Sequence, residues 1–146
     1  RLVPLGLCAL GFYIFTLGAS LPAMDEFWLS RTMKEQIADL GGCTEPDLVT
    51  IEYREPSLVF NFGTGTLLGD LDSAVAHLGS HPQCGIAAIG ENNYAAFLET
   101  SRQAGLPLKI LGVVHGYNYT KGDALTLTLF SHEASRYPVP DGGAGD

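Results

Sequence analysis

The sequence has little positive charge for its length. Its 146 residues contain 8 lysine and arginine residues against 16 aspartate and glutamate residues, for a formal net charge of −8. Proteins that bind nucleic acid or lie flat on anionic lipid usually present basic patches to these partners. The composition therefore argues against nucleic acid and against a domain that lies flat on a lipid surface.

The first part of the sequence lacks charge altogether, because no charged residue occurs between Leu2 and Leu21. A helix over this stretch would reach roughly 30 Å, the thickness of one hydrocarbon core. Lipid offers no hydrogen-bond partners to a backbone, so a helix that satisfies its own polar groups is favoured there. We predict a transmembrane helix within residues 1–24. A secretory signal peptide and a buried core helix are the two alternatives.

The residues around the predicted span indicate its orientation and context. Arg1 precedes the span and Asp25 with Glu26 follows it, which favours a cytoplasmic N-terminus. The sequence does not begin with Met, so we expect a fragment that starts at the last span of a larger membrane protein. Residues 25–131 would then form an extracytoplasmic domain. Residues 132–146, with their prolines, glycines and acidic side chains, are expected to be a disordered tail.

Beyond the predicted span, helical and strand patterns alternate. A helix is expected over 30–40, where apolar residues recur at spacings of three and four. The alternation predicts an α/β sandwich with a mixed sheet that ends in a β-hairpin. Later helices are expected to begin at Pro56, after Asp70 or Asp72 as N-cap, and after Asn92 or Asn93 as N-cap. The strands are expected at Asp47–Tyr53, Thr66–Leu68, Cys84–Ile89, Leu108–His115 and Ala124–Phe130.

The sequence contains 3 cysteines. Cys8 lies in the predicted span and is interpreted as a packing residue. Cys43 and Cys84 each precede a predicted strand, so a parallel sheet would place both at the same end. A disulfide between them would close a loop of about 40 residues and stabilise the fold by roughly 4 kcal/mol in the chain-entropy model. Two unpaired buried thiols are the favoured interpretation, with the Cys43–Cys84 disulfide as the alternative.

The end of the first predicted strand is the best candidate for a binding site. Tyr53, Arg54, Glu55 and Ser57 occupy the boundary between this strand and the next helix. Ligands of open α/β sheets bind at the carboxyl ends of strands, and helix N-termini attract anions. The alternative, which the residue types favour, is that Arg54 and Glu55 are solvated and Ser57 belongs to the first helical turn.

The rest of the sequence offers a second candidate surface but no catalytic set. Tyr117, Asn118 and Tyr119 lie in the predicted hairpin turn, where they would either bind a partner or pack locally. His77 and His81 have a helical metal spacing, yet no Cys or acidic partner stands at ligand spacing, so no metal site is predicted. No serine has the glycine-flanked setting of a nucleophile elbow.

Several segments taken together have a family resemblance. They are the uncharged N-terminal stretch, Phe27-Trp28-Leu29-Ser30, the run from Tyr53 to Phe60 (YREPSLVF), the Gly63-Thr64 turn and the hairpin from Gly116 to Gly122 (GYNYTKG). This set resembles the C-terminal end of bacterial membrane glycosyltransferases of family 39. These enzymes are related to dolichyl-phosphate-mannose protein mannosyltransferases and to the aminoarabinose transferases that modify lipid A. The resemblance covers roughly residues 1–131.

The resemblance implies a polytopic enzyme of the bacterial inner membrane with the GT-C architecture. Such enzymes transfer a sugar from a polyprenyl-phosphate donor to a lipid or protein acceptor on the outer side of the membrane. Their catalytic carboxylates lie in the first extracytoplasmic loop, so no catalytic residue is carried onto this sequence. The domain would then be a periplasmic cap or an acceptor-positioning module without a cofactor of its own. Whether the full-length enzyme uses a divalent metal is left open.

Two alternatives from other classes are also open. One is a binding or interaction domain without enzymatic activity, held to the membrane by a single span. The other is a small secreted enzyme behind a signal peptide, which would need a nucleophile, a base and an orienting group in one cleft. The coding sequence upstream of Arg1 would distinguish the transferase from the single-span protein.

Overall fold

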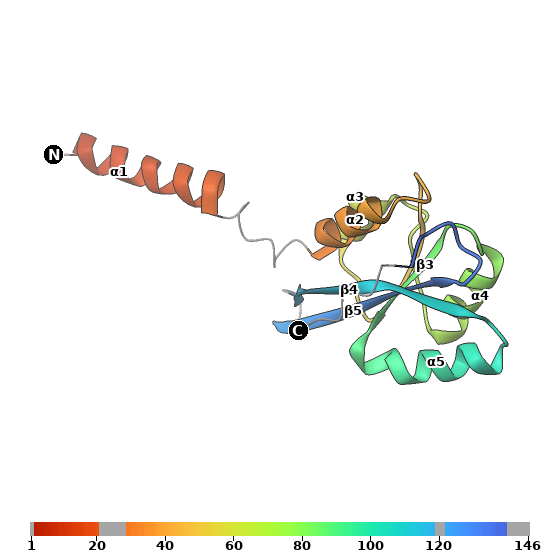
Figure 1. Cartoon of the computed structure of the whole chain (residues 1–146). Coiled ribbons are helices and arrows are strands. Elements are labelled where there is room, and N and C mark those ends of the chain that lie inside the picture. The colour runs from red at the N-terminus through yellow and green to blue at the C-terminus, as the bar shows by residue number, and fades with distance from the viewer. Residues whose placement is uncertain (1, 21–28, 119–121, 140–146) are drawn as a thin grey trace.

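The computed structural model describes residues 2–20, 29–118 and 122–139, and it contains a five-stranded mixed sheet with helices on both faces (Figure 1). The strand order is β2-β1-β3-β5-β4; β1 is parallel to β2 and β3, whereas β5 is antiparallel to β3 and β4. The α/β fold, the mixed sheet and the closing hairpin are thereby confirmed. The strands are β1 (Asp47–Ile51), β2 (Leu67–Leu68), β3 (Gly85–Gly90), β4 (Leu108–Asn118) and β5 (Asp123–His132). The helices of the domain are α2 (Leu29–Leu40), α3 (Pro56–Phe62), α4 (Leu71–Ser80) and α5 (Tyr94–Gln103), with a 3₁₀ turn at Glu91–Asn93.

The N-terminal segment forms a separate helix, α1 (Leu2–Phe15), which continues as a π-helix at Thr16–Ser20 (Figure 1). Among the described residues, no helix combines the length and the apolarity needed to cross a membrane. The expected single transmembrane helix over 1–24 is therefore not found: the α-helix has 14 residues and gives way to a π-turn at Thr16. Residues 21–24 of that prediction lie outside the described residues.

Two apolar cores lie on the two faces of the sheet. Side chains alternate along a strand, so neighbouring residues of β1 enter different cores. Leu48 joins the core under α2 and α3, whereas Val49 joins the core under α4 and α5. Since both faces are covered, every residue of β3 is buried, which explains why that strand is apolar throughout.

The chain reverses its winding direction between β1 and β3. From β1 it passes through α3 to β2 at one edge of the sheet, and α4 then returns it to β3 on the other side of β1. Such a reversal leaves a crevice at the carboxyl ends of the two strands, where open α/β sheets bind ligands. This end of the sheet is where Ile51 and Gly90 stand.

Local sequence explains how the intervening helices begin and end. Pro56 occupies the first turn of α3, and Gly63 ends that helix with a φ of +88°, a value that a residue without Cβ adopts readily. Asp70 is the N-cap of α4: its carboxylate accepts from the Ser73 N–H at 2.9 Å, and the Ser73 hydroxyl accepts from the Asp70 N–H at 2.7 Å. This capping box fixes the boundary between β2 and α4.

Cys43 and Cys84 form a disulfide, so the favoured interpretation of two unpaired thiols was wrong. The register of the sheet explains the bond. Asp47 of β1 pairs with Gly85 of β3, and the segments that enter these two strands therefore run side by side. The Cα atoms of Cys43 and Cys84 are 5.8 Å apart, within the range that a disulfide requires.

Part of the expected tail packs onto the domain. β5 extends to His132, and Tyr137 is buried in the core under α2 and α3. The Lys109 ammonium group donates to the carbonyl oxygens of Ser135 and Tyr137, which holds the segment against β4. For residues 132–139 the expectation of disorder thus does not hold, and residues 140–146 lie outside the described residues.

Candidate functional site

Three of the four residues expected at the β1–α3 boundary come together. The Tyr53 hydroxyl donates to Glu55 Oε2 at 3.0 Å, and the Ser57 hydroxyl donates to the same oxygen at 3.4 Å. Tyr53 and Glu55 are buried, with exposed fractions of 1% and 3%, whereas Arg54 is exposed. The prediction that Glu55 is solvated is therefore wrong.

Two features stabilise the hydrogen bond between Tyr53 and Glu55. Glu55 immediately precedes the first residue of α3, so its carboxylate lies at the positive end of that helix. Burial raises the pKa of Tyr53 well above its ordinary value, and the negative charge of Glu55 acts in the same direction. The phenol therefore remains protonated and continues to donate to Glu55 at neutral pH.

Asn61 extends the cluster to the neighbouring helix. Its amide nitrogen donates to the Ser30 hydroxyl of α2 and to the Ser57 carbonyl of α3, both at 3.0 Å. Ser30 is buried and is the second residue of α2. The cluster thus joins α2 to α3 by hydrogen bonds, an arrangement that positions helices and contains no activated nucleophile.

Glu52, a residue that sequence reasoning missed, lies at the carboxyl ends of β1 and β3. Its carboxylate accepts from the Asn92 amide at 2.5 Å and from the Asn93 amide at 3.1 Å. A Cβ on Gly90 would lie 2.2 Å from Glu52 Oε2, so the absence of a side chain at Gly90 leaves the room that Glu52 occupies. At this end of the sheet, Glu52 therefore joins the loop after β1 to the turn after β3.

Glu52 also explains two differences from the predicted elements. It adopts a φ of +79°, which few residues other than glycine adopt, and this ends β1 at Ile51 rather than at Tyr53. Asn93 precedes α5 as predicted, but its side chain makes no cap hydrogen bond; its amide nitrogen donates to Glu52. No residue pattern in the sequence indicates a positive φ at a glutamate.

The hairpin residues lie at the β4–β5 turn. The Tyr117 hydroxyl donates to the Gly122 carbonyl at 2.5 Å and so braces the turn. Asn118 is the last residue of β4, and Tyr119 lies outside the described residues. This hydrogen bond is local to the hairpin.

The two histidines singled out by spacing contact each other and the backbone. Their rings stack with centroids 4.6 Å apart, His77 Nε2 lies 3.0 Å from the Asp47 carbonyl oxygen, and His81 Nδ1 lies 3.1 Å from the His77 carbonyl oxygen. In the part of the chain that the structure describes, no group of three or more His, Cys, Asp or Glu residues could hold a metal ion.

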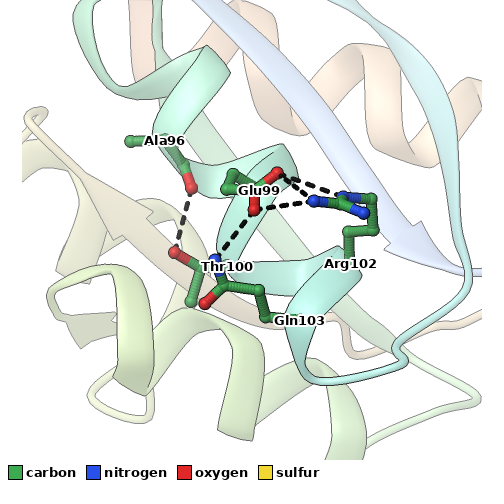
Figure 2. Close-up of polar contacts among 5 residues, drawn as sticks. All are labelled: Ala96, Glu99, Thr100, Arg102 and Gln103. Atoms are coloured by element: carbon green, nitrogen blue, oxygen red, sulfur yellow. Dashed lines mark hydrogen bonds and ion pairs between the residues drawn. The ribbon is translucent and has the colours of Figure 1, made fainter.

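A polar network on the exposed face of α5 has the spacing of an ordinary helix surface (Figure 2). Arg102 donates to the Glu99 carboxylate at 2.8 Å, and Gln103 donates to it at the same distance. These two donors hold the pKa of Glu99 below its usual range. Exposed pairs three and four residues apart stabilise a helix slightly and need no ligand.

Comparisons of the chain with protein-family models, with curated proteins and with solved structures find no match. Function must therefore be inferred from the residues and their arrangement.

Proposed function

We propose that this chain is the C-terminal part of an integral-membrane glycosyltransferase of the GT-C architecture, located in the bacterial inner membrane. The full-length enzyme would transfer a sugar from a polyprenyl-phosphate donor to a lipid or protein acceptor. The α/β domain would lie on the periplasmic side as a non-catalytic cap or an acceptor-positioning module.

The apolar surface of α1 is the observation that carries the proposal. Its large side chains are exposed around the helix, among them Leu10, Phe12 and Ile14, with exposed fractions of 57%, 67% and 64%. Leaving such surface in water costs roughly 25 cal/mol for each Å². A lipid environment removes this cost.

The length of the apolar segment is compatible with lipid only if the π-turn is included. The 14 residues of α1 reach about 21 Å, less than a hydrocarbon core. With Thr16–Ser20 the helical backbone covers residues 2–20 and reaches at most roughly 28 Å. The proposed membrane segment therefore contains both α1 and the π-turn.

Two further observations support the proposal. The segments around Tyr53–Phe60 and the hairpin resemble those of family 39 enzymes. The Cys43–Cys84 bond adds weak support, since disulfides persist in oxidising compartments such as the periplasm.

The membrane segment is tested by expressing the chain in bacteria and extracting the membranes with alkaline carbonate. We expect the chain to stay in the membrane pellet and Leu10→Arg to release a large fraction of it. Thr100→Arg on exposed α5 is the control and should stay in the pellet. Complete extraction of the unaltered chain would overturn the proposal.

The transferase itself is tested on the gene. The coding sequence upstream of Arg1 should encode about ten further spans, with paired acidic residues in the first outer loop. A start codon within a few residues of Arg1 would instead favour the single-span binding domain, which shares the membrane segment but has no catalytic part.

A further inference from the structure

A cavity of about 500 Å³ opens at the amino end of β1, at the opposite end of that strand from Glu52. Its walls are the second half of α2, the segment that enters β1 and the end of α3. The volume lies within the range of small-molecule sites. It is therefore a second candidate site, which shares Asn61 with the polar cluster around Glu55.

The charged side chains of this cavity are available to a ligand. Lys34 of α2, with Glu45 and Asp47 before and at the start of β1, line it and make no side-chain hydrogen bond or ion pair among the described residues. Asn61 also lines it, and because its amide nitrogen donates to Ser30 and Ser57, its amide oxygen is left as an acceptor.

Apolar side chains complete the cavity. Ile37 of α2 is fully buried and Phe62 of α3 is half-buried, and both contribute to the lining. The cavity thus offers one ammonium donor, several oxygen acceptors and an aromatic ring. This combination fits a compact molecule that has both hydroxyl groups and a C–H face.

The balance of charge selects among such molecules. Two carboxylates and one ammonium group line the cavity, all on exposed residues, so we expect it to disfavour phosphates and carboxylates and to accept neutral or singly cationic ligands. Sugar hydroxyls donate to carboxylates and accept from an ammonium group, whereas an amino group on the sugar would pair with Glu45 or Asp47.

From this chemistry we propose that the cavity binds a sugar unit without net negative charge, either a neutral hexose or an amino sugar. The biological role of that sugar, as part of the acceptor that the domain positions, rests on the proposed function. Binding itself depends only on the lining residues.

The test is a titration of the full chain in detergent micelles, followed by saturation-transfer NMR. The probes are the methyl glycosides of glucose, mannose and glucosamine, with inorganic phosphate as the anion. We expect at least one glycoside to bind and phosphate not to bind. Lys34→Met and Asp47→Asn should each weaken binding about tenfold, the loss of one charge-assisted hydrogen bond. Glu99→Gln on α5 is the charge-matched control and should bind as the unaltered chain does.

Several outcomes would overturn the inference. Absence of binding by every glycoside, preferential binding of phosphate, or binding that survives both cavity substitutions would each do so. A folded variant is recognised by retained amide dispersion, and Lys34→Gln, which is shorter but keeps a polar end group, checks a loss seen with Lys34→Met. A chain that resists carbonate extraction but binds no glycoside contradicts this inference alone, whereas a chain that binds glycosides but is extracted contradicts the proposed function alone.

Discussion

The side-chain amide of Asn93 donates to the carboxylate of Glu52 at 3.1 Å, across 41 residues of sequence. The bond joins the loop after β1 to the turn after β3, at the point where the chain reverses its winding direction. Glu52 can reach this place because its backbone has a positive φ and because Gly90 has no side chain there. A structural contact therefore lies at the end of the sheet where open sheets bind ligands.

Replacing Gly90 by alanine should therefore destabilise the domain. The new Cβ would displace the Glu52 carboxylate from its two asparagine partners, and we expect a loss of about 1–3 kcal/mol in the free energy of unfolding. Urea denaturation of Gly90→Ala, Glu52→Gly and the double variant measures the coupling. In the Glu52→Gly background the alanine should cost at least about 1 kcal/mol less, whereas additive effects would show that the contact is unimportant.

Removing the disulfide should also lower stability. The bond constrains the unfolded chain by closing a loop with a sequence separation of 41, worth about 4 kcal/mol in the chain-entropy model. The double variant Cys43→Ser/Cys84→Ser should show this loss in urea, and reductant should destabilise the unaltered chain but not the double variant. Cys8→Ser is the control and should have no effect on the domain, so an equal loss there would contradict the prediction.

Tyr53→Phe tests the buried polar cluster. The substitution removes the donor that lies 3.0 Å from the Glu55 carboxylate, and we expect a loss of about 1–2 kcal/mol in the free energy of unfolding. Tyr94→Phe is the matched control, since its hydroxyl makes no hydrogen bond among the described residues, and it should change stability by less than about 0.5 kcal/mol. Equal effects of the two substitutions would mean that the Tyr53 hydroxyl does not support Glu55.

Unlike Tyr53→Phe, the substitution Tyr137→Phe should stabilise the domain at neutral pH. The Tyr137 hydroxyl is buried without a hydrogen-bond partner among the described residues, so removing it should raise the free energy of unfolding by about 1 kcal/mol. A loss of more than about 1 kcal/mol would show that the hydroxyl has a partner.

The same residue should give the protein an alkaline dependence. Burial, together with the negative charge of Asp47, raises the pKa of Tyr137 from 10.0 to about 12. The folded state then holds the phenol proton more tightly than the unfolded state does. This contribution to stability is complete below pH 10 and is lost as the pH rises from about 10 to about 12. Between pH 8 and pH 11, the urea midpoint of Tyr137→Phe should fall less than that of the unaltered chain. Any fall that remains in the variant includes the contribution of Tyr53.

The fold class could be predicted because its determinants are local. The continuous apolar pattern of β3, the proline and glycine around α3, and the alternation in β5 each indicate one element and its burial. The sequence allowed the disulfide as an alternative interpretation, since both cysteines precede predicted strands. Choosing it required the β1–β3 register, a long-range property that residue patterns do not contain.

The candidate site was predicted only in part, for the same reason. The YREPS segment, residues 53–57, has the residue types of a strand-to-helix junction, but its pattern does not indicate that Glu55 is buried. The role of Glu52 depends on Gly90 and two asparagines from another loop. Contacts of this kind join segments some 40 residues apart, and the periodic pattern of apolar residues in a sequence does not indicate them.

The Cys43–Cys84 bond encloses a complete unit of the fold, because β1, α3, β2 and α4 all lie between the two cysteines. The bond can form readily only once β3 has docked beside β1, so its appearance during synthesis would report that docking. The β4–β5 hairpin lies outside the enclosed loop and can be added afterwards. Trapping of free thiols in a timed refolding reaction would thus report when β3 docks beside β1 and the parallel half of the sheet assembles.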